Sequence, residues 1–234
     1  MLARTGSKLL PKKSGFNLDK VQQTIHGYDQ TASEFARKNY AIDLSEQRRR
    51  FLGLLDPQNA AQPLLDLGCG PGRDTLDFIA QGYSCVGIDL SAGMLTEARQ
   101  RIPQGQFVQA NMLNLPFAAE TFGGVWACAS LLHLPRPDAV PALVEMYRIL
   151  KPGGSLFLGV QRGQGEACRE KERAKEGDIL RFFYTYYLPG EFWNLVADSG
   201  FEVEALAENF SDTNIRPDGS PVRWINLYAR KPAA

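Results

Sequence analysis

The chain has 234 residues, of which 26 are Lys or Arg and 26 are Asp or Glu, so its formal net charge is zero. A neutral chain has no overall field that would attract a nucleic acid or an anionic membrane, so we expect a small-molecule partner. With 44% apolar residues, a chain of this length can bury a core as one domain without disulfides.

Cysteine and histidine usage favours a cytoplasmic protein with reduced thiols. The four cysteines form no C-x-x-C pair, and two histidines leave too few well-spaced ligands for zinc. No stretch approaches the ~18 consecutive apolar residues of a membrane span. We therefore expect no metal and no membrane partner.

The N-terminal region divides into a basic tail and a helical segment. Residues 1–17 contain four basic and no acidic residues, without the arginine and serine density of a transit peptide, so we expect a disordered tail rather than a functional arm. Residues 18–55 predict two or three helices. Apolar and aromatic positions, including Tyr28, Phe35 and Tyr40, fall near one helical face and either pack as core or contact a ligand.

Residues 64–72, with the sequence LLDLGCGPG, predict an apolar strand followed by a glycine turn. Asp66 lies toward the carboxyl end of this strand, where it could hold a cationic or hydroxylated ligand group. Gly68, Gly70 and Gly72 let the backbone turn sharply and approach a ligand without a Cβ clash. Residues 74–80 then show helical spacing, so the turn joins a strand to a helix.

Two further strands end in polar residues. Residues 85–90 contain Asp89, roughly 20 residues beyond the glycines, where a carboxylate can accept both hydroxyls of a ribose. Residues 107–112 contain Asn111, which could meet an adenine edge. The carboxyl ends of parallel strands share one crevice, so these groups are expected to surround one nucleoside.

A nicotinamide-dependent oxidoreductase is the rival interpretation of this pattern. The dinucleotide fingerprint G-x-G-x-x-G, started at Gly68, requires a glycine at position 73, where this chain has Arg73. Asp66, just before the turn, also suits an amino group or a sulfonium better than a pyrophosphate. We rank this alternative well behind a nucleoside cofactor of another kind.

Together with VGIDLS at 86–91, LPF at 115–117 and LKPGG at 150–154, these stretches resemble the class I S-adenosylmethionine (SAM)-dependent methyltransferases. The resemblance runs from about Tyr28 to Pro232. It implies an α/β fold with a doubly wound, mostly parallel seven-stranded sheet whose last strand is antiparallel, forming a single domain over residues 18–234. It also implies SAM as cofactor, with S-adenosylhomocysteine (SAH) as product.

The resemblance assigns the methionine part of the cofactor to Asp66 and the glycine-turn backbone, its ribose to Asp89 and its adenine to Asn111 and Met112. This chain has Asn111 where the family commonly has Asp; the amide oxygen still accepts from an adenine amino group. Gly123 also replaces a frequent Asp. The full set of implied cofactor-binding residues is Tyr28, Asp66, Gly68, Cys69, Gly70, Gly72, Arg73, Asp89, Leu90, Asn111, Met112, Cys128 and Ala129.

The remaining sheet strands are expected at 125–129, 155–160, 201–206 and 223–229, the last two as a hairpin. Residues 161–190 are the predicted acceptor-binding cap, because loops at the carboxyl ends of strands carry variable binding groups. The alternating charges at 169–173 predict a solvated helix. The aromatic block at 182–187 suits either core packing or a flat acceptor. The predicted substrate-binding residues are Tyr40, His133, Glu166, Phe183, Tyr184 and Tyr187.

Methyl transfer requires a positioned nucleophile and, for some acceptors, a base. His133 follows the fourth strand and titrates in the useful range, so it is our candidate catalytic base, with loop orientation as the alternative role. His26, Glu166 and Tyr184 are weaker candidates. Asn114 precedes the fourth strand and is interpreted as a turn residue, which argues against adenine-specific nucleic-acid methylation.

We therefore hypothesise a cytoplasmic SAM-dependent methyltransferase that acts on an oxygen or nitrogen of a small, possibly aromatic metabolite, as a monomer or homodimer. An RNA or protein methyltransferase is the alternative, which a contiguous basic groove would favour. A non-catalytic SAM-binding module is the second alternative, which a pocket without access to the methyl group would favour.

Overall fold

The computed structural model describes residues 15–172, 179–215 and 219–233. The predicted tail over residues 1–17 lies mostly outside this part, and the first helix begins at Gly15. The helices are α1 (Gly15–Asn39), α2 (Ser45–Gly53), α3 (Arg73–Ala80), α4 (Ala92–Arg101), α5 (Ala139–Ile149) and α6 (Pro189–Asp198), with short 3-10 turns η1 (Leu131–His133) and η2 (Arg136–Asp138). The strands are β1 (Leu64–Leu67), β2 (Cys85–Asp89), β3 (Gln106–Gln109), β4 (Phe122–Cys128), β5 (Leu150–Gln161), β6 (Glu166–Glu172), β7 (Ile179–Thr185), β8 (Glu202–Ile215) and β9 (Pro221–Arg230).

Seven of these strands form one sheet in the order β3-β2-β1-β4-β5-β9-β8. Strands β1 to β5 pair in parallel, whereas β9 runs antiparallel to both β5 and β8. The predicted doubly wound sheet with an antiparallel last strand is therefore confirmed. The chain connects β1 to β2 on one side of β1, whereas β4 lies on its other side. The strand order therefore reverses at β1, and ligands bind beside such switch points at the carboxyl edge of the sheet.

Alternating side chains along the central strands build a separate core on each face of the sheet. Val125 and Ala127 join the larger core, to which α5 and α6 contribute Leu143 and Phe192. Trp126, between them in the sequence, joins the second core with residues of α2 and α3. Successive side chains of a strand point to opposite faces of the sheet, so a strand that is covered on both faces contributes alternately to two cores.

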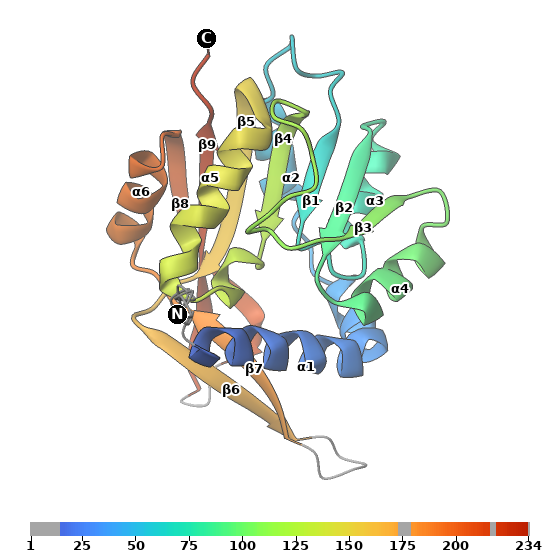
Figure 1. Ribbon diagram of the computed structural model, residues 1–234, viewed down its shortest axis with the longest axis vertical. Helices are drawn as coiled ribbons and strands as arrows, with labels where there is room; N and C mark the ends of the chain where they lie inside the picture. The colour runs from blue at the N-terminus through green and yellow to red at the C-terminus, as the bar shows by residue number, and fades with distance from the viewer. Residues whose placement is uncertain (1–14, 173–178, 216–218, 234) are drawn as a thin grey trace, which may run out of the picture.

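Helix α1 lies across the carboxyl edge of the sheet (Figure 1). Hydrogen bonds to its side chains help to hold it there. Asp29 Oδ1 accepts from the Ser91 hydroxyl at 2.6 Å and from Gly93 N at 2.9 Å, at the start of α4. Thr24 Oγ1 accepts from Phe183 N on β7 at 2.9 Å. Of the two or three helices expected over residues 18–55, the structure contains two, α1 and α2.

Residues 161–190 contain a two-stranded sheet, β6 paired antiparallel with β7, below α1 in Figure 1. The predicted helix at 169–173 is therefore wrong over its described part. The alternation of charge at these positions also fits an exposed strand. Antiparallel pairing with β7, from Arg169–Phe182 to Glu172–Ile179, fixes the extended form. None of the described helices is long and apolar enough to cross a membrane.

Candidate functional site

A cavity of about 890 Å³ lies at the carboxyl edge of the sheet, between the strand ends, α1 and β7. It brings together many of the predicted site residues. Those that line it are Tyr28, Gly68, Cys69, Gly70, Arg73, Asp89, Leu90, Met112, Cys128, Ala129, His133 and Tyr184. The volume falls near the upper end of the ~300–1,000 Å³ typical of ligand pockets.

The glycine turn has the backbone conformation that the sequence predicts. Gly68, Gly70 and Gly72 have φ of +78°, +53° and +87°, a region that L side chains rarely adopt. At Gly68 the constraint is also steric, because an added Cβ would lie 2.2 Å from the Ser130 Cβ. Gly72 is buried and precedes α3, so it shapes the turn without lining the cavity.

Asp89 sits at the end of β2 and fixes the glycine turn while facing the cavity. Its Oδ2 accepts from Gly70 N at 2.9 Å, and its Oδ1 accepts from Ser91 N at 2.8 Å. Burial raises the pKa of this carboxyl, while the backbone hydrogen bonds oppose the rise. Each carboxylate oxygen keeps a further lone pair, so Asp89 can still accept hydrogen bonds from a diol.

Asp66 does not line the cavity, so its placement does not support the expected direct contact with the cofactor. Its Oδ2 accepts from Thr75 N at 2.9 Å and from the Thr75 hydroxyl at 2.6 Å, inside the first turn of α3. Burial, followed by the nearby charge of Asp74, raises the pKa of Asp66 to about 7. Its role in the structure is to hold α3 against β1.

Arg73 and Asp74 belong to a buried charge cluster behind the glycine turn. The Asp74 carboxylate accepts from Arg48 and Arg73, each at 2.6 Å, and from Trp126 Nε1 at 3.1 Å. Burial alone would raise the pKa of Asp74, but Arg73 and then Arg48 lower it below its usual range. A buried carboxylate needs this compensation.

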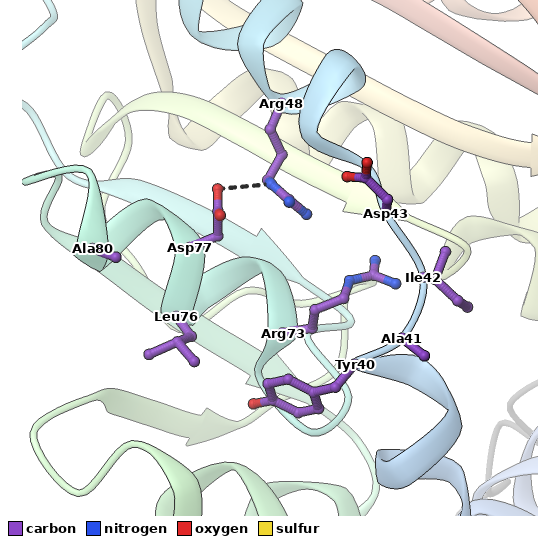
Figure 2. A pocket seen from close by; sticks show the side chains of 9 residues that line it. All are labelled: Tyr40, Ala41, Ile42, Asp43, Arg48, Arg73, Leu76, Asp77 and Ala80. Atoms are coloured by element: carbon purple, nitrogen blue, oxygen red, sulfur yellow. Dashed lines mark ion pairs between the residues drawn. The ribbon is translucent and has the colours of Figure 1, made fainter.

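A smaller cavity of about 440 Å³ adjoins this cluster, and Figure 2 shows the ion pair between Arg48 and Asp77 at its wall. Tyr40 lines this smaller cavity and not the larger one. Its hydroxyl donates to the Pro71 carbonyl at 2.9 Å, so its placement does not support the predicted acceptor contact.

His133 and Tyr28 form a hydrogen-bonded pair in the large cavity. His133 Nδ1 lies 2.7 Å from the Phe183 carbonyl, which can only accept, so Nδ1 carries the proton. His133 Nε2 therefore accepts from the Tyr28 hydroxyl, also at 2.7 Å. Burial lowers the pKa of His133 to about 4 and raises that of Tyr28 well above its ordinary value. Both groups are neutral near pH 7, and the histidine is a weaker base than its sequence position suggested.

Four further predicted residues lie outside the cavity. Asn111 is exposed, and its Oδ1 accepts from Leu113 N at 3.0 Å, so Ala110 and Met112 face the cavity in its place. Glu166 is exposed and pairs with Lys20 at 3.3 Å.

Phe183 and Tyr187, by contrast, are buried at 1% and 0% exposure and pack as core. Phe183 contributes to the site only through its carbonyl, which accepts from His133.

Sequence reasoning missed a group of cavity residues on the later strands. They come from the end of β5 and from the β8–β9 hairpin: Gln161, Asn209, Phe210, Trp224 and Asn226. Gln161 could have been found, since it is the polar residue at the carboxyl end of a predicted parallel strand. The hairpin residues depend on register and carry no local signal.

The two cavity thiols are unreactive in this environment. Burial raises the pKa of Cys69 well above its ordinary value and that of Cys128 to about 12. Both remain protonated near pH 7, and the thiolate is the nucleophilic form. Neither cysteine therefore provides a nucleophile for covalent chemistry.

A family model described as "Methyltransferase domain" matches residues 64–154. A putative methyltransferase of Encephalitozoon cuniculi is 33% identical over 196 residues, which cover 75% of this chain and 85% of that protein. The chain belongs to the SAM-dependent methyltransferases.

Two further proteins are similar to this methyltransferase at lower sequence identity. An O-methyltransferase of Aspergillus sclerotiorum is 28% identical over 74% of the chain, which spans just under two thirds, 66%, of that enzyme. The crystal structure of a 1,6-didemethyltoxoflavin-N1-methyltransferase of Burkholderia thailandensis, with 1,6-didemethyltoxoflavin and SAH bound, aligns with a TM-score of 0.65. It is 18% identical, and the alignment covers 98% of this chain and 94% of that one, so the likeness concerns the fold.

The residues present fit the family's cofactor, SAM. The glycine turn removes side chains where a ligand approaches the backbone, and Asp89 offers lone pairs for hydroxyl groups. Ala110 and Met112 add apolar surface beside them. The buried Ser130 hydroxyl, which also lines the cavity, has no hydrogen-bond partner among the described residues. A polar ligand group beside Gly68 would satisfy it.

Proposed function

We propose that this methyltransferase moves a methyl group from SAM to an oxygen or nitrogen of a small, neutral acceptor. The observation that carries the proposal is that one cavity joins the glycine turn and Asp89 to the half-buried Tyr28–His133 pair. A cofactor site and a hydrogen-bonding site for a second molecule would then share one space under α1.

The charges that line the cavity support a small acceptor over a nucleic acid. Among the described lining residues, the cations are Lys38, Arg73 and, at low pH, His133, and acidic residues such as Asp43 and Asp89 offset them. A nucleic-acid site needs a contiguous basic surface, which this balance does not provide. The N1-methyltransferase of Burkholderia thailandensis is named for a small molecule, 1,6-didemethyltoxoflavin, in line with this proposal.

When bound, SAM would supply a sulfonium-activated methyl group, which the acceptor's nucleophilic atom would take by in-line attack as SAH leaves. The chain's own contribution is to hold the two molecules in line and to exclude water. Asp89 orients the cofactor's diol, and α1 with β7 covers the cavity. Tyr28 Oη keeps a lone pair for an O–H or N–H of the acceptor, because its own proton is donated to His133 Nε2.

The Tyr28–His133 pair also offers a path for the acceptor's proton. As that proton passes to Tyr28 Oη, the Tyr28 proton passes to His133 Nε2, and the imidazolium then releases it to solvent. The lowered pKa of His133 makes this relay a weak base. It therefore suits acceptors whose X–H is acidic or whose nucleophilic lone pair is already free, rather than aliphatic alcohols.

The proposal is tested by calorimetry with SAH and by transfer of labelled methyl from SAM to a panel of small metabolites. We expect SAH binding in the wild type, and methyl transfer to a small-molecule fraction that is about tenfold to a hundredfold slower in Tyr28→Phe. Transfer to RNA or protein in preference to every metabolite fraction would overturn the small-acceptor proposal. Binding of SAH without transfer to any acceptor would instead support a non-catalytic module.

A further inference from the structure

One end of the large cavity is neutral, in contrast to the cofactor end. The described lining residues from β5, β7, β8 and β9 carry no charged side chain. They are three amides and three aromatic residues: Gln161, Tyr184, Asn209, Phe210, Trp224 and Asn226. Charged lining residues such as Lys38, Arg73 and Asp89 come from α1, α3 and β2. An ionic acceptor would find no counter-charge among these lining residues, and the nearby Arg169 is engaged with Gln161 and Tyr184, so this end favours an uncharged ligand.

Sheet register places the amides next to one another. Gln161 on β5 is opposite Trp224 on β9, and Trp224 is opposite Asn209 on β8. Directly paired residues project from the same face of a sheet. Asn226 follows two positions after Trp224 on the same strand, so its side chain shares that face. Its own neighbours in register are Gly159 and Ala207, which leave room beside the amide.

The orientation of the Gln161 amide is set by a partner that can only donate. Arg169 on β6 donates to Gln161 Oε1 at 3.0 Å, and the Arg169 guanidinium itself packs over the Tyr184 ring at 4.7 Å. The amide oxygen therefore faces Arg169, and Nε2 keeps its two N–H groups. No described residue accepts from Nε2, although Gln161 is only 4% exposed and lines the cavity.

Asn226 presents the complementary group. Its Nδ2 donates to Asn209 Oδ1 at 2.6 Å, and its own Oδ1 has no donor among the described residues. Asn226 is 7% exposed and lines the cavity. Gln161 thus offers a donor, and Asn226 on the neighbouring strand offers an acceptor, beside the ring of Trp224.

We propose that Gln161 and Asn226 recognise a neutral, planar acceptor that carries a lactam edge, an adjacent carbonyl and ring N–H. The Gln161 Nε2–H donates to the lactam carbonyl, Asn226 Oδ1 accepts from the lactam N–H, and Trp224 contributes apolar contact to the ring. A second ring N–H of such an acceptor, or its enol O–H, is also more acidic than an aliphatic alcohol, which matches the weak base formed by Tyr28 and His133. This inference rests on the proposed function and names its acceptor class.

The probe is lumazine, a neutral bicyclic lactam, titrated at pH 6.5 into the protein saturated with SAH. Two matched compounds are 1,3-dimethyllumazine, whose lactam N–H groups are blocked, and 2,3-dihydroxynaphthalene, which has the ring size without the lactam. We expect lumazine to bind at least about tenfold more tightly than either, because each comparison removes hydrogen bonds that leave buried polar groups unpaired.

The decisive variant is Gln161→Glu, which keeps an oxygen for Arg169 and replaces the Nε2 donor by an acceptor. We expect its affinity for lumazine to fall at least about tenfold, and that of Asn226→Ala about as far, with SAH affinity unchanged. Gln106→Glu, at an exposed position on β3, is the matched control. Equal binding of lumazine and its dimethyl derivative, or no effect of Gln161→Glu while SAH still binds, would overturn the lactam assignment alone. Failure to bind SAH would overturn the proposed function and this inference together.

Discussion

The Tyr28 hydroxyl donates to His133 Nε2 at 2.7 Å, which joins a residue of α1 to one in the turn after β4 across 105 positions of sequence. The proton on His133 Nδ1 is fixed by the Phe183 carbonyl. The tyrosine, the imidazole and a backbone carbonyl therefore form one chain of hydrogen bonds. A change in either side chain alters the hydrogen bonding of the other.

Removal of either side-chain group should impair turnover more than cofactor binding. We expect Tyr28→Phe and His133→Gln each to lower kcat about tenfold to a hundredfold, the lower end of what proton transfer contributes. The Kd for SAH should stay within about threefold of wild type, since Phe keeps the ring. Because the two residues act as one unit, the double variant should lose little more than either single variant. If the fold-decrease in kcat of the double variant equals the product of the two single decreases, the residues act independently.

The lowered pKa of His133 predicts a specific loss of stability in acid. In the unfolded chain, His133 has its ordinary pKa of ~6.5, whereas in the folded protein its pKa is about 4. As the pH falls from 6.5 toward 4, the unfolded state therefore binds the proton before the folded state does. The stabilisation is complete above pH 6.5 and falls as the pH drops toward 4. Between pH 7.5 and pH 5 the expected loss is about 2 kcal/mol.

Urea unfolding at the two pH values, compared between wild type and His133→Gln, isolates this contribution. Asp66 acts in the opposite direction, because its raised pKa of about 7 favours the folded state at low pH and loses that advantage as the pH rises through 7. The variant retains Asp66, so the difference between the two proteins reports on His133. Identical pH dependence in both would contradict the neutral, buried imidazole.

Asp89 should be the strongest single determinant of cofactor affinity among the predicted residues. Asp89→Ala removes the acceptor for Gly70 N and the lone pairs offered to a ribose, and a charge-assisted hydrogen bond is worth ~1.5 to 3 kcal/mol. We expect the Kd for SAH, measured by calorimetry, to rise more than tenfold. Adenine alone should lose much less affinity, and a comparable loss for adenine would point to a collapsed turn instead of a lost ribose contact.

Asp66 should matter for stability and not for direct cofactor binding. Asp66→Ala leaves the buried N–H and hydroxyl of Thr75 without their acceptor, which should cost about 2 to 4 kcal/mol in the free energy of unfolding. Asp66→Asn keeps the shape and one acceptor oxygen, so it should retain SAH binding within about threefold. A large loss of SAH affinity in the stable Asn variant would restore the direct role that the sequence first suggested.

The contact between Gly68 and Ser130 can be tested as a pair. Gly68→Ala forces a Cβ to 2.2 Å from the Ser130 Cβ at a φ of +78°, which should cost about 2 kcal/mol or more in stability. Adding Ser130→Gly removes the opposing Cβ and should recover part of this loss, while Ser130→Ala keeps it and should not. Equal rescue by both would show that the hydroxyl, and not the Cβ, causes the conflict.

Much of the cofactor side of this molecule could be predicted from sequence because its signals are local. The glycine turn, Asp89 at the end of β2 and the positions of most sheet strands along the chain follow from short patterns that hold in the structure. The hydrogen bonds of Asp66 to Thr75 were not foreseen, because Thr75 lies nine positions later in the next helix. The sequence placed the Asp66 carboxylate on the correct strand, but it could not show which groups donate hydrogen bonds to it.

The acceptor side could be predicted only in outline. The alternating charges around Arg169 fit a helix surface and an exposed strand equally well, and only the register with β7 decides between them. Gln161, Trp224 and Asn226 come together through the pairing of β5 with β9, which no local pattern encodes. Of the aromatic block, Tyr184 alone lines the cavity, because strand alternation and burial turn Phe183 and Tyr187 into the core.

The four thiols of this protein differ sharply in accessibility. Cys69 and Cys85 are buried and Cys128 is half-buried, with pKa values raised by burial, whereas Cys168 is exposed on β6. A maleimide fluorophore should therefore label Cys168 selectively without any mutagenesis. Because this strand belongs to the hairpin that carries Arg169, the dye would report in real time on whether the hairpin moves when ligands enter and leave.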